Sequence, residues 1–317
     1  MIDVHAHLCP LPFIDQAEKR MNPPYPLRIA RLLDRLPSMT DPEMRLRAMD
    51  EQDIEKSILS LAAVNIWPWN PQKAVELSRI ANETLKEVCN RYPERFLALG
   101  TVPLESPMEA AKELEYTVVT LGFPGVMVGA NIQGQPLDEQ VFTDFWETAD
   151  RLGAIVFIHP AEIHGITSLN NFGLRPVLGY LFDTSIAVAR LALSGHLELY
   201  PHVHIIIPHL GGVLPFVLNR LDRGYEIHEE TRHIEVHAPS HYLTNGNVYY
   251  DTVSLHRPAL LATLETVGVQ QLLFGSDSPH TTGGTPEEIC SALKSLGLSP
   301  EEELLVLKGN ANNLFKL

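Results

Sequence analysis

This sequence of 317 residues is poor in cysteine, in positive charge and in long apolar runs. Its three cysteines, Cys9, Cys89 and Cys290, are too few and too far apart for a disulfide framework or a CxxC metal site. The balance of 24 Lys and Arg against 39 Asp and Glu gives a net charge of -15, which disfavours nucleic acid and anionic lipid as partners. No apolar run approaches the roughly 20 residues of a membrane span, and the N-terminus has no signal pattern. We therefore expect a soluble cytoplasmic protein that acts on a small molecule.

The sequence does contain a regular alternation of strand-like and helix-like segments. Short runs rich in β-branched residues recur between longer stretches of helical period, and eight of them can be counted. They are Ile2–His5, Ser57–Ala63, Phe96–Val102, Gly125–Val128, Ala154–His159, Val203–Pro208, Val248–Val253 and Leu272–Ser276. This pattern predicts an α/β fold, a (β/α)₈ TIM barrel that occupies residues 1–317 as a single domain.

Clear start and stop signals mark several of the intervening helices. The segment Asp138–Leu152 has apolar residues at helical spacing, among them Val141, and Gly153 follows as a stop. The hydroxyl residues Thr285 and Ser299 each precede a proline and two glutamates, which is typical of a capped helix start.

Two segments interrupt this rhythm. Residues from about Cys9 to Thr40 contain several prolines and no strand, so we expect an insertion after the first strand that covers the barrel mouth. Residues from about Tyr225 to Asn247 are polar, irregular and rich in histidine.

Five polar residues stand at or just after the C-terminal ends of predicted strands. His5 and His7 are two apart on the first strand and therefore face the same side. His159, His209 and Asp277 each follow an apolar run at the same chain polarity. A single such histidine is more often a packed or turn residue than a ligand, but the C-terminal ends of all strands of a parallel barrel meet at one rim. The five together predict a metal centre there.

Imidazole and carboxylate ligands suit zinc, manganese or iron. We expect one divalent ion, with zinc favoured and manganese as the alternative. Three histidines and one aspartate would leave a position open for water or substrate, and an open position indicates catalysis.

The sequence resembles the aminocarboxymuconate semialdehyde decarboxylase branch of the amidohydrolase superfamily, and the resemblance covers nearly the whole chain. The motifs that carry the resemblance are His5-x-His7, the Asp-Pro-Glu-Met-Arg segment within 40–50, Gly-Phe-Pro-Gly-Val at 122–126, Phe-Ile-His-Pro at 157–160, His-Leu-Gly-Gly at 209–212, and Phe-Gly-Ser-Asp at 274–277.

The resemblance implies a role for each matching residue. It implies that His5, His7, His159 and Asp277 hold the metal and that His209 moves protons beside it. It also implies a homodimer or higher oligomer, in which Arg220 reaches a neighbouring subunit's site and binds a substrate carboxylate.

This sequence also departs from the family pattern. The family's prototype has a second carboxylate-binding arginine before the Asp-Pro-Glu motif, but here Arg28, Arg31 and Arg35 do not align cleanly with it. We therefore expect a natural substrate other than the muconate semialdehyde itself.

Other candidates have two readings each. Trp67 and Trp69 either wall an aromatic substrate pocket or pack against their neighbours. Arg220 contacts substrate or pairs with an acid such as Asp222. Arg45 and Arg47 are interpreted as solvated or ion-paired.

Two loop histidines, His164 and His280, each follow a predicted ligand by a few residues. They are candidates only for a position behind the ligands.

The favoured function is a metal-dependent, non-oxidative decarboxylase of a small aromatic or conjugated carboxylic acid. Asp277 and His209 would be its catalytic residues. The same ligands could serve a hydrolase of a C–C, lactone or amide bond, or a hydratase. A non-enzymatic metal-binding barrel is disfavoured because a structural zinc site has no need of the additional His209.

Overall fold

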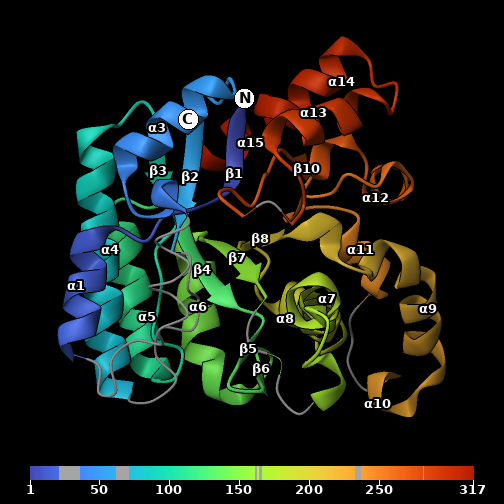
Figure 1. Cartoon of the computed structure of the whole chain (residues 1–317). Helices are drawn as coiled ribbons and strands as arrows, with labels where there is room; N and C mark the ends of the chain where they lie inside the picture. The colour runs from blue at the N-terminus through green and yellow to red at the C-terminus, as the bar shows by residue number, and fades with distance from the viewer. Residues whose placement is uncertain (21–35, 62–70, 161–162, 164–165, 233–236, 281) are drawn as a thin grey trace.

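In the computed structural model, eight parallel strands form the wall of a barrel (Figure 1). The structure describes residues 1–317 except 21–35, 62–70, 161–162, 164–165, 233–236 and 281. The barrel strands are β1 (Ile2–His7), β2 (Lys56–Ser60), β3 (Phe96–Ala98), β4 (Gly125–Gly129), β7 (Ile155–His159), β8 (His204–Ile207), β9 (Val248–Asp251) and β10 (Leu272–Leu273). A small hairpin of β5 (Asn131–Ile132) and β6 (Gln135–Pro136) follows β4. All eight predicted strands are confirmed, with shifts of a few residues at their ends.

Hydrogen bonding connects these strands into a closed ring. The strands β1, β2 and β3 pair in that order, and a second run pairs in the order β4, β7, β8, β9 and β10. A parallel bridge between Gly100 and Val126 joins the two runs on one side, and a bridge between Ala6 and Ser278 joins them on the other. Because every strand is parallel to its neighbours, all C-terminal ends open at one rim, as the barrel prediction requires.

Helices surround the barrel and connect its strands. They are α1 (Leu11–Arg20), α3 (Pro42–Glu51), α4 (Pro71–Arg91), α5 (Pro107–Glu115), α6 (Thr143–Leu152), α7 (Tyr180–Leu193), α8 (His196–Leu199), α9 (Leu214–Ile227), α10 (Glu229–Arg232), α11 (Pro239–Leu243), α12 (Arg257–Val267), α13 (Pro286–Lys294), α14 (Pro300–Leu304) and α15 (Asn310–Phe315). Short 3₁₀ turns are η1 (Pro37–Met39), η3 (Gln140–Phe142), η4 (Thr167–Leu169), η6 (His209–Gly211) and η7 (Val269–Gln271), and π turns are η2 (Tyr116–Thr120), η5 (Arg175–Gly179) and η8 (Leu305–Gly309).

The helix signals read from the sequence are confirmed, with one correction. Thr285 and Ser299 form capping boxes at the starts of α13 and α14. Gly153 ends α6 in the left-handed conformation, with φ of 59°. Val141, however, lies on the 3₁₀ turn η3 and is 48% exposed. It is not part of the buried stripe because α6 begins only at Thr143.

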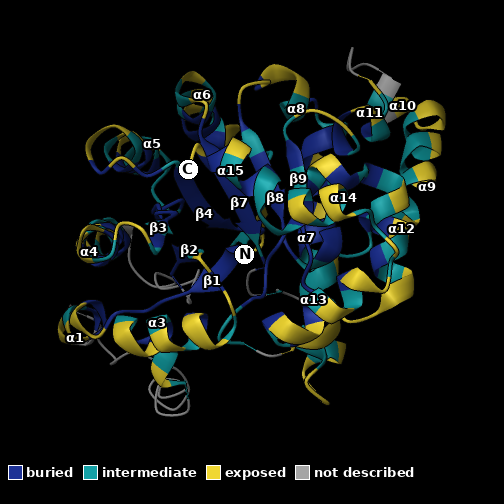
Figure 2. Cartoon of the chain, turned by 90° about the horizontal axis from the view of Figure 1, so that it is seen from above, coloured by how far each residue is buried: buried dark blue, intermediate teal, exposed yellow. Residues whose placement is uncertain are grey.

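The core divides between the outside and the inside of the barrel wall. Val126, Val156 and Ile205 point outward and pack under the helices. On β7 the alternate residues Ile155 and Phe157 belong to a separate cluster. That cluster also contains Ala311, Leu314 and Phe315 of the last helix, α15, which lies over the amino-terminal ends of the strands (Figure 2).

The predicted insertion after β1 is described only in part. Its two ends meet where the Cys9 N–H donates to the Met39 carbonyl at 2.6 Å. Helix α1 packs against α4 through Phe13, Ile14 and Ala17. Residues 21–35 lie outside the described residues, so cover of the barrel mouth stays a prediction.

Within the described residues, one helical stretch, Arg175–Leu193, is long and apolar enough to cross a membrane by length and composition. Its mean hydropathy is 1.3. This is weak evidence for a span, because a helix that packs against a protein core passes the same test. Val188, Leu191 and Ala192 on this helix are fully buried and pack against the outside of the barrel wall. The expected absence of a membrane partner stays a prediction.

Candidate metal centre

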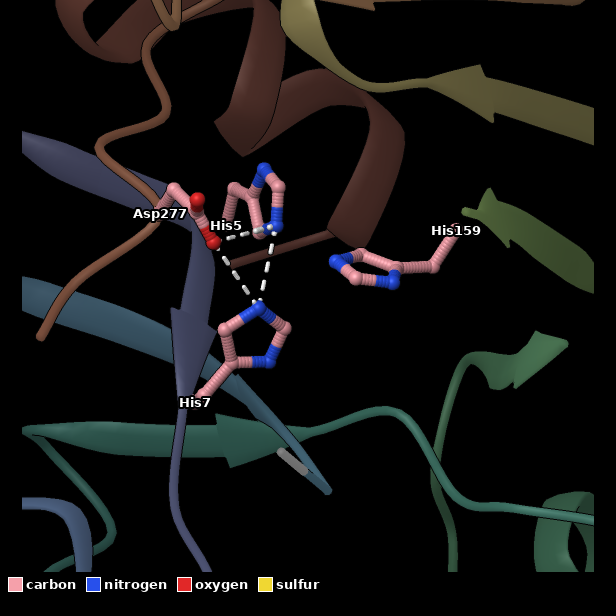
Figure 3. A group of neighbouring side chains, drawn as sticks. All are labelled: His5, His7, His159 and Asp277. Atoms are coloured by element: carbon pink, nitrogen blue, oxygen red, sulfur yellow. Dashed lines mark hydrogen bonds and ion pairs between the residues drawn. The ribbon is translucent and has the colours of Figure 1, made fainter. Parts of the chain in front are cut away.

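Four of the predicted residues meet at the C-terminal rim of the barrel. His5 and His7 come from β1, His159 from the end of β7, and Asp277 from the segment after β10. One ligand atom from each lies within 4.8 Å of the others, and the group could hold a metal ion. Figure 3 shows His159 pointing toward the other three from the opposite wall.

The nitrogen and oxygen atoms at the centre face one another closely. His5 Nε2 lies 3.1 Å from His7 Nε2, and Asp277 Oδ1 lies 3.2 Å and 3.0 Å from these two nitrogens (Figure 3). The rings of His5 and His159 have centroids 5.3 Å apart. Such a convergence of lone pairs is unfavourable unless a positive charge lies between them.

The far nitrogen of each histidine ring has a partner that orients it. His5 Nδ1 lies 2.7 Å from Asp251 Oδ2. His7 Nδ1 lies 3.0 Å from Ser60 Oγ, and His159 Nδ1 lies 3.1 Å from the Pro160 carbonyl. Nδ1 donates in at least the first and third pairs, because carboxylate and carbonyl oxygens can only accept. Nε2 is then free to bind an ion, which is how metal-ligating histidines are held. The donor set therefore fits a divalent metal ion.

Electrostatics at the centre favour a cation. Burial alone would lower the pKa of His5, but Asp277 and Asp251 outweigh burial and raise that pKa to about 10. Burial lowers the pKa of His7 to about 4 and places that of His159 well below its usual range. Burial would raise the pKa of Asp277, but the neighbouring histidines hold it well below the usual range. The centre thus contains an ionised Asp277 and neutral imidazoles at His7 and His159, and its carboxylates draw a positive charge to His5 that a bound ion could supply in place of a ring proton.

His209 stands beside this group, as predicted. Its Nε2 lies 3.7 Å from Asp277 Oδ2, and its ring centroid is 5.4 Å from that of His5. Its Nδ1 is buried and has no hydrogen-bond partner among the described residues. The two oxygens of Asp277 thus face different partners. Oδ1 faces His5 and His7, and Oδ2 faces His209.

The backbone is strained at these positions. His209, Leu210 and Asp277 have φ of 55°, 56° and 59°, in the left-handed region that residues other than glycine seldom adopt. Such conformations cost on the order of 1–3 kcal/mol each and concentrate at functional sites. Asp251 stabilises the loop at His209, since its Oδ1 accepts the Leu210 N–H at 3.3 Å and the Val253 N–H at 3.1 Å.

The other predicted site residues are placed less clearly. Arg220 lies exposed on α9, and it forms no ion pair with Asp222 or any other described residue. Its predicted contact with substrate stays a prediction. Trp67, Trp69 and His164 lie outside the described residues. His280 lies near the ligands, with its ring centroid 5.6 Å from that of His7.

Sequence reasoning missed two supporting residues, Asp251 and Ser60, and misread a third, Arg45. Asp251 is the last residue of β9, so its position at a strand end could have been found from the sequence by the rule that found the histidines. Ser60 ends β2 in the same way. Arg45 was interpreted as solvated or ion-paired, but it is only 2% exposed. That interpretation was wrong because Arg45 shares the buried face of α3 with Met49, four residues on.

Comparison with known proteins places the chain in a family. A model of the amidohydrolase family matches residues 2–317. The chain therefore belongs to the amidohydrolase family.

Named relatives within this family share a reaction type. A gamma-resorcylate decarboxylase of Rhizobium radiobacter is 30% identical over 87% of this chain and 87% of its own length. A 2-amino-3-carboxymuconate-6-semialdehyde decarboxylase of Dictyostelium discoideum is 27% identical over 86% of this chain and 75% of its own. A crystal structure of a dihydroxybenzoic acid decarboxylase from Polaromonas sp., with bound manganese and the inhibitor 2-nitroresorcinol, covers 100% of this chain and 96% of its own, with 26% identity and a TM-score of 0.83.

Proposed function

We propose that this protein is a metal-dependent, non-oxidative decarboxylase of a small hydroxylated aromatic carboxylic acid. The observation that carries the proposal is the convergence of His5, His7, His159 and Asp277 on one point, with His209 facing the second oxygen of Asp277. The named decarboxylase relatives support the reaction type.

In this proposal, His5, His7, His159 and Asp277 hold one divalent ion. Zinc was favoured from the sequence, but we now propose manganese, because the Polaromonas relative was crystallised with manganese bound. When bound, the ion supplies Lewis-acid stabilisation of negative charge on the substrate's oxygen atoms.

The residues of the chain would move the proton. Decarboxylation requires a proton on the ring carbon that carries the carboxylate; the C–C bond then breaks, its electron pair returns to the ring, and carbon dioxide leaves. Asp277 Oδ2 and His209 Nε2, 3.7 Å apart, are the pair that would deliver this proton. A hydroxylated ring suits the step because its oxygen can carry the charge that develops.

We further propose that the protein works as a homodimer in which Arg220 binds the substrate carboxylate of the partner's site. Leu178 of η5 and Phe182 and Ile186 of α7 are exposed at intervals of four residues, and Phe216 on the adjacent helix α9 is 92% exposed. Exposed apolar side chains on neighbouring helices support the proposal of an interface here. Covering these side chains with a second copy would also place α9, which carries Arg220, at the interface.

The variant Phe182→Glu should then be a monomer that keeps its metal and has a higher KM. Sedimentation measures the oligomeric state and kinetic assays measure the KM. A fully active monomer would contradict the proposal.

The test of the reaction combines metal analysis with substrate screening. We expect about one equivalent of metal per chain, and carbon dioxide release from a panel of hydroxybenzoates such as 2,6-dihydroxybenzoate. The loss of ultraviolet absorbance should match the carbon dioxide released. Chelation should abolish the activity, and added Mn²⁺ should restore it.

Other outcomes would select an alternative. Absorbance loss without carbon dioxide, in a panel that includes muconate-type acids, would favour the hydrolase or hydratase. A protein that binds no divalent ion would contradict the metal centre itself.

The remaining expectations are also proposals. We propose a cytoplasmic enzyme without nucleic-acid or membrane partners, on the basis of its net charge of -15 and its scattered cysteines.

A further inference from the structure

The ring of strands closes at a narrow seam between the first and last strands. There the described residues form one parallel bridge, between Ala6 and Ser278. The Val4 N–H donates to the Phe274 carbonyl at 2.9 Å, and the His7 N–H donates to the Ser278 carbonyl at 2.7 Å. The proposed ligands His5 and His7 lie on one side of this seam, and Asp277 lies on the other. The distances between them therefore depend on how the seam is held.

Arg45 spans the seam from helix α3. Its Nη2 donates to the His7 carbonyl at 2.6 Å and to the Ser278 carbonyl at 3.1 Å. Its Nη1 donates to Ser278 Oγ at 2.5 Å. The Arg45 guanidinium thus binds both sides of the seam. It binds His7, a proposed ligand on β1, and Ser278, which directly follows the proposed ligand Asp277.

Asp3 crosses the same seam on the other side of Asp277. This fully buried carboxylate accepts the Ser276 N–H at 3.0 Å and the Ser276 hydroxyl at 2.6 Å. It also accepts the N–H of His5 at 3.1 Å. Asp277 is therefore held through both of its chain neighbours, Ser276 by Asp3 and Ser278 by Arg45.

We propose that Arg45 is a positioning residue, which fixes Asp277 relative to His5 and His7 and so sets how tightly the metal is held. An apolar side chain would fill the same space with no desolvation cost, and buried charges seldom add net stability over such a residue. The fork of the guanidinium can bind both strand ends at once, whereas the single ammonium of lysine cannot do so in the same geometry. The inference rests on the metal centre proposed above.

The test measures metal release in Arg45→Met, Arg45→Lys and Ser278→Ala, with Arg47→Met as the matched control on the exposed face of α3. Each protein is loaded with Mn²⁺ and mixed with excess chelator, and the release rate is followed. Unfolding of the metal-free proteins is measured in parallel. We expect Arg45→Met to release Mn²⁺ about 10–100-fold faster than wild type, which is the usual loss when an outer partner of a ligand is removed. Arg45→Lys and Ser278→Ala should be intermediate, and Arg47→Met should match wild type.

The outcomes separate this inference from the proposed function. If folded Arg45→Met releases Mn²⁺ at the wild-type rate, Arg45 is only a structural anchor and the inference is overturned while the metal centre stands. A shift in metal-free unfolding alone would overturn it in the same way. Should Arg45→Met fail to fold, the other two variants decide, and wild-type release rates in both would overturn the inference. A wild-type protein that binds no Mn²⁺ would overturn the metal centre together with the inference.

Discussion

The two ends of the barrel are built from the same strands but differ in chemistry. At the C-terminal rim, His5, His7 and Asp277 face one another, and the backbone at Asp277 is strained. Toward the amino-terminal ends, Ile155 belongs to an apolar cluster with Phe315 of α15, where both are nearly inaccessible to solvent. The rim gathers polar groups around one positive charge, whereas the base buries apolar surface, which stabilises the fold by about 25 cal/mol per Å².

This difference assigns stability and function to separate ends. Phe157 marks the boundary, since its ring belongs to the apolar cluster and lies 5.0 Å from the ring of His5. Substitutions at the rim should therefore change chemistry more than folding, and substitutions at the base should do the opposite.

The largest effect is expected from Asp277→Asn. Asparagine tolerates the positive φ of this position but replaces the carboxylate that, in the proposed function, faces the ion and moves the proton. Activity should fall by at least on the order of 10⁴. Metal content and kcat measure this loss, and circular dichroism checks that the variant is folded. A folded variant with wild-type metal content and kcat would contradict the assignment.

His209→Asn should separate proton transfer from metal binding. We expect kcat to fall by about 10²–10⁴ because a general acid is removed, while the metal content stays at the wild-type level. Asparagine again accommodates the positive φ of 55°. His228→Asn, at an exposed position after α9, is the control. Loss of metal in His209→Asn would show instead that His209 is a ligand.

Phe315→Ala tests the opposite end. Removal of this side chain, which is 5% exposed, should lower the free energy of unfolding by about 3–5 kcal/mol. The metal content and kcat per folded molecule should not change. Denaturant titration measures the first quantity, and Leu317→Ala, at a position that is 43% exposed, is the control. A large loss of metal in folded Phe315→Ala would mean that the two ends are coupled.

The smallest effect concerns Glu105, in the loop after β3. Burial raises the pKa of this carboxyl from 4.5 to about 7, and its Oε2 has no partner among the described residues. The folded protein therefore binds this proton more tightly than the unfolded chain does. The contribution of Glu105 to the free energy of unfolding is fully present below pH 4.5 and is lost as the pH rises through about 7.

Glu105→Gln should lack this slope in its stability. Relative to wild type, its free energy of unfolding should gain at most about 3 kcal/mol between pH 4.5 and 8. Urea titrations at the two pH values measure the change, with exposed Glu94→Gln as the control. A constant difference between Glu105→Gln and wild type across this range would refute the prediction.

The barrel and the four-residue centre were predictable from the sequence, because both follow from periodicity and chain polarity. A strand end is a local signal, and His5, His159 and Asp277 all lie at or within a few residues of one. The ends of elements were less accurate, as the late start of α6 shows. Its first turn is 3₁₀, and periodicity does not distinguish that turn from an α-helix.

The supporting residues were not predicted because their role depends on pairing across the barrel. Asp251 is assigned only when His5, 246 residues away, is found 2.7 Å from it. Arg45 reaches Ser278 over a separation of 233 residues. An arginine among Met44, Leu46 and Met49 was interpreted as solvated or ion-paired, and burial of an arginine is indeed uncommon. Arg45 can be buried because oxygen atoms of His7 and Ser278, far from it in the sequence, accept its hydrogen bonds. No single segment of the sequence shows these acceptors.

The seam between β1 and the last strand also determines when the centre can exist during synthesis. The proposed ligands lie at residues 5, 7, 159 and 277, so a nascent chain contains the three histidine ligands well before it contains the carboxylate. Domains generally fold as units, and a chain that has not reached residue 277 cannot assemble this set. We therefore expect the proposed ion to be bound only after residue 277 has been made, and chains that end before this residue should not retain it.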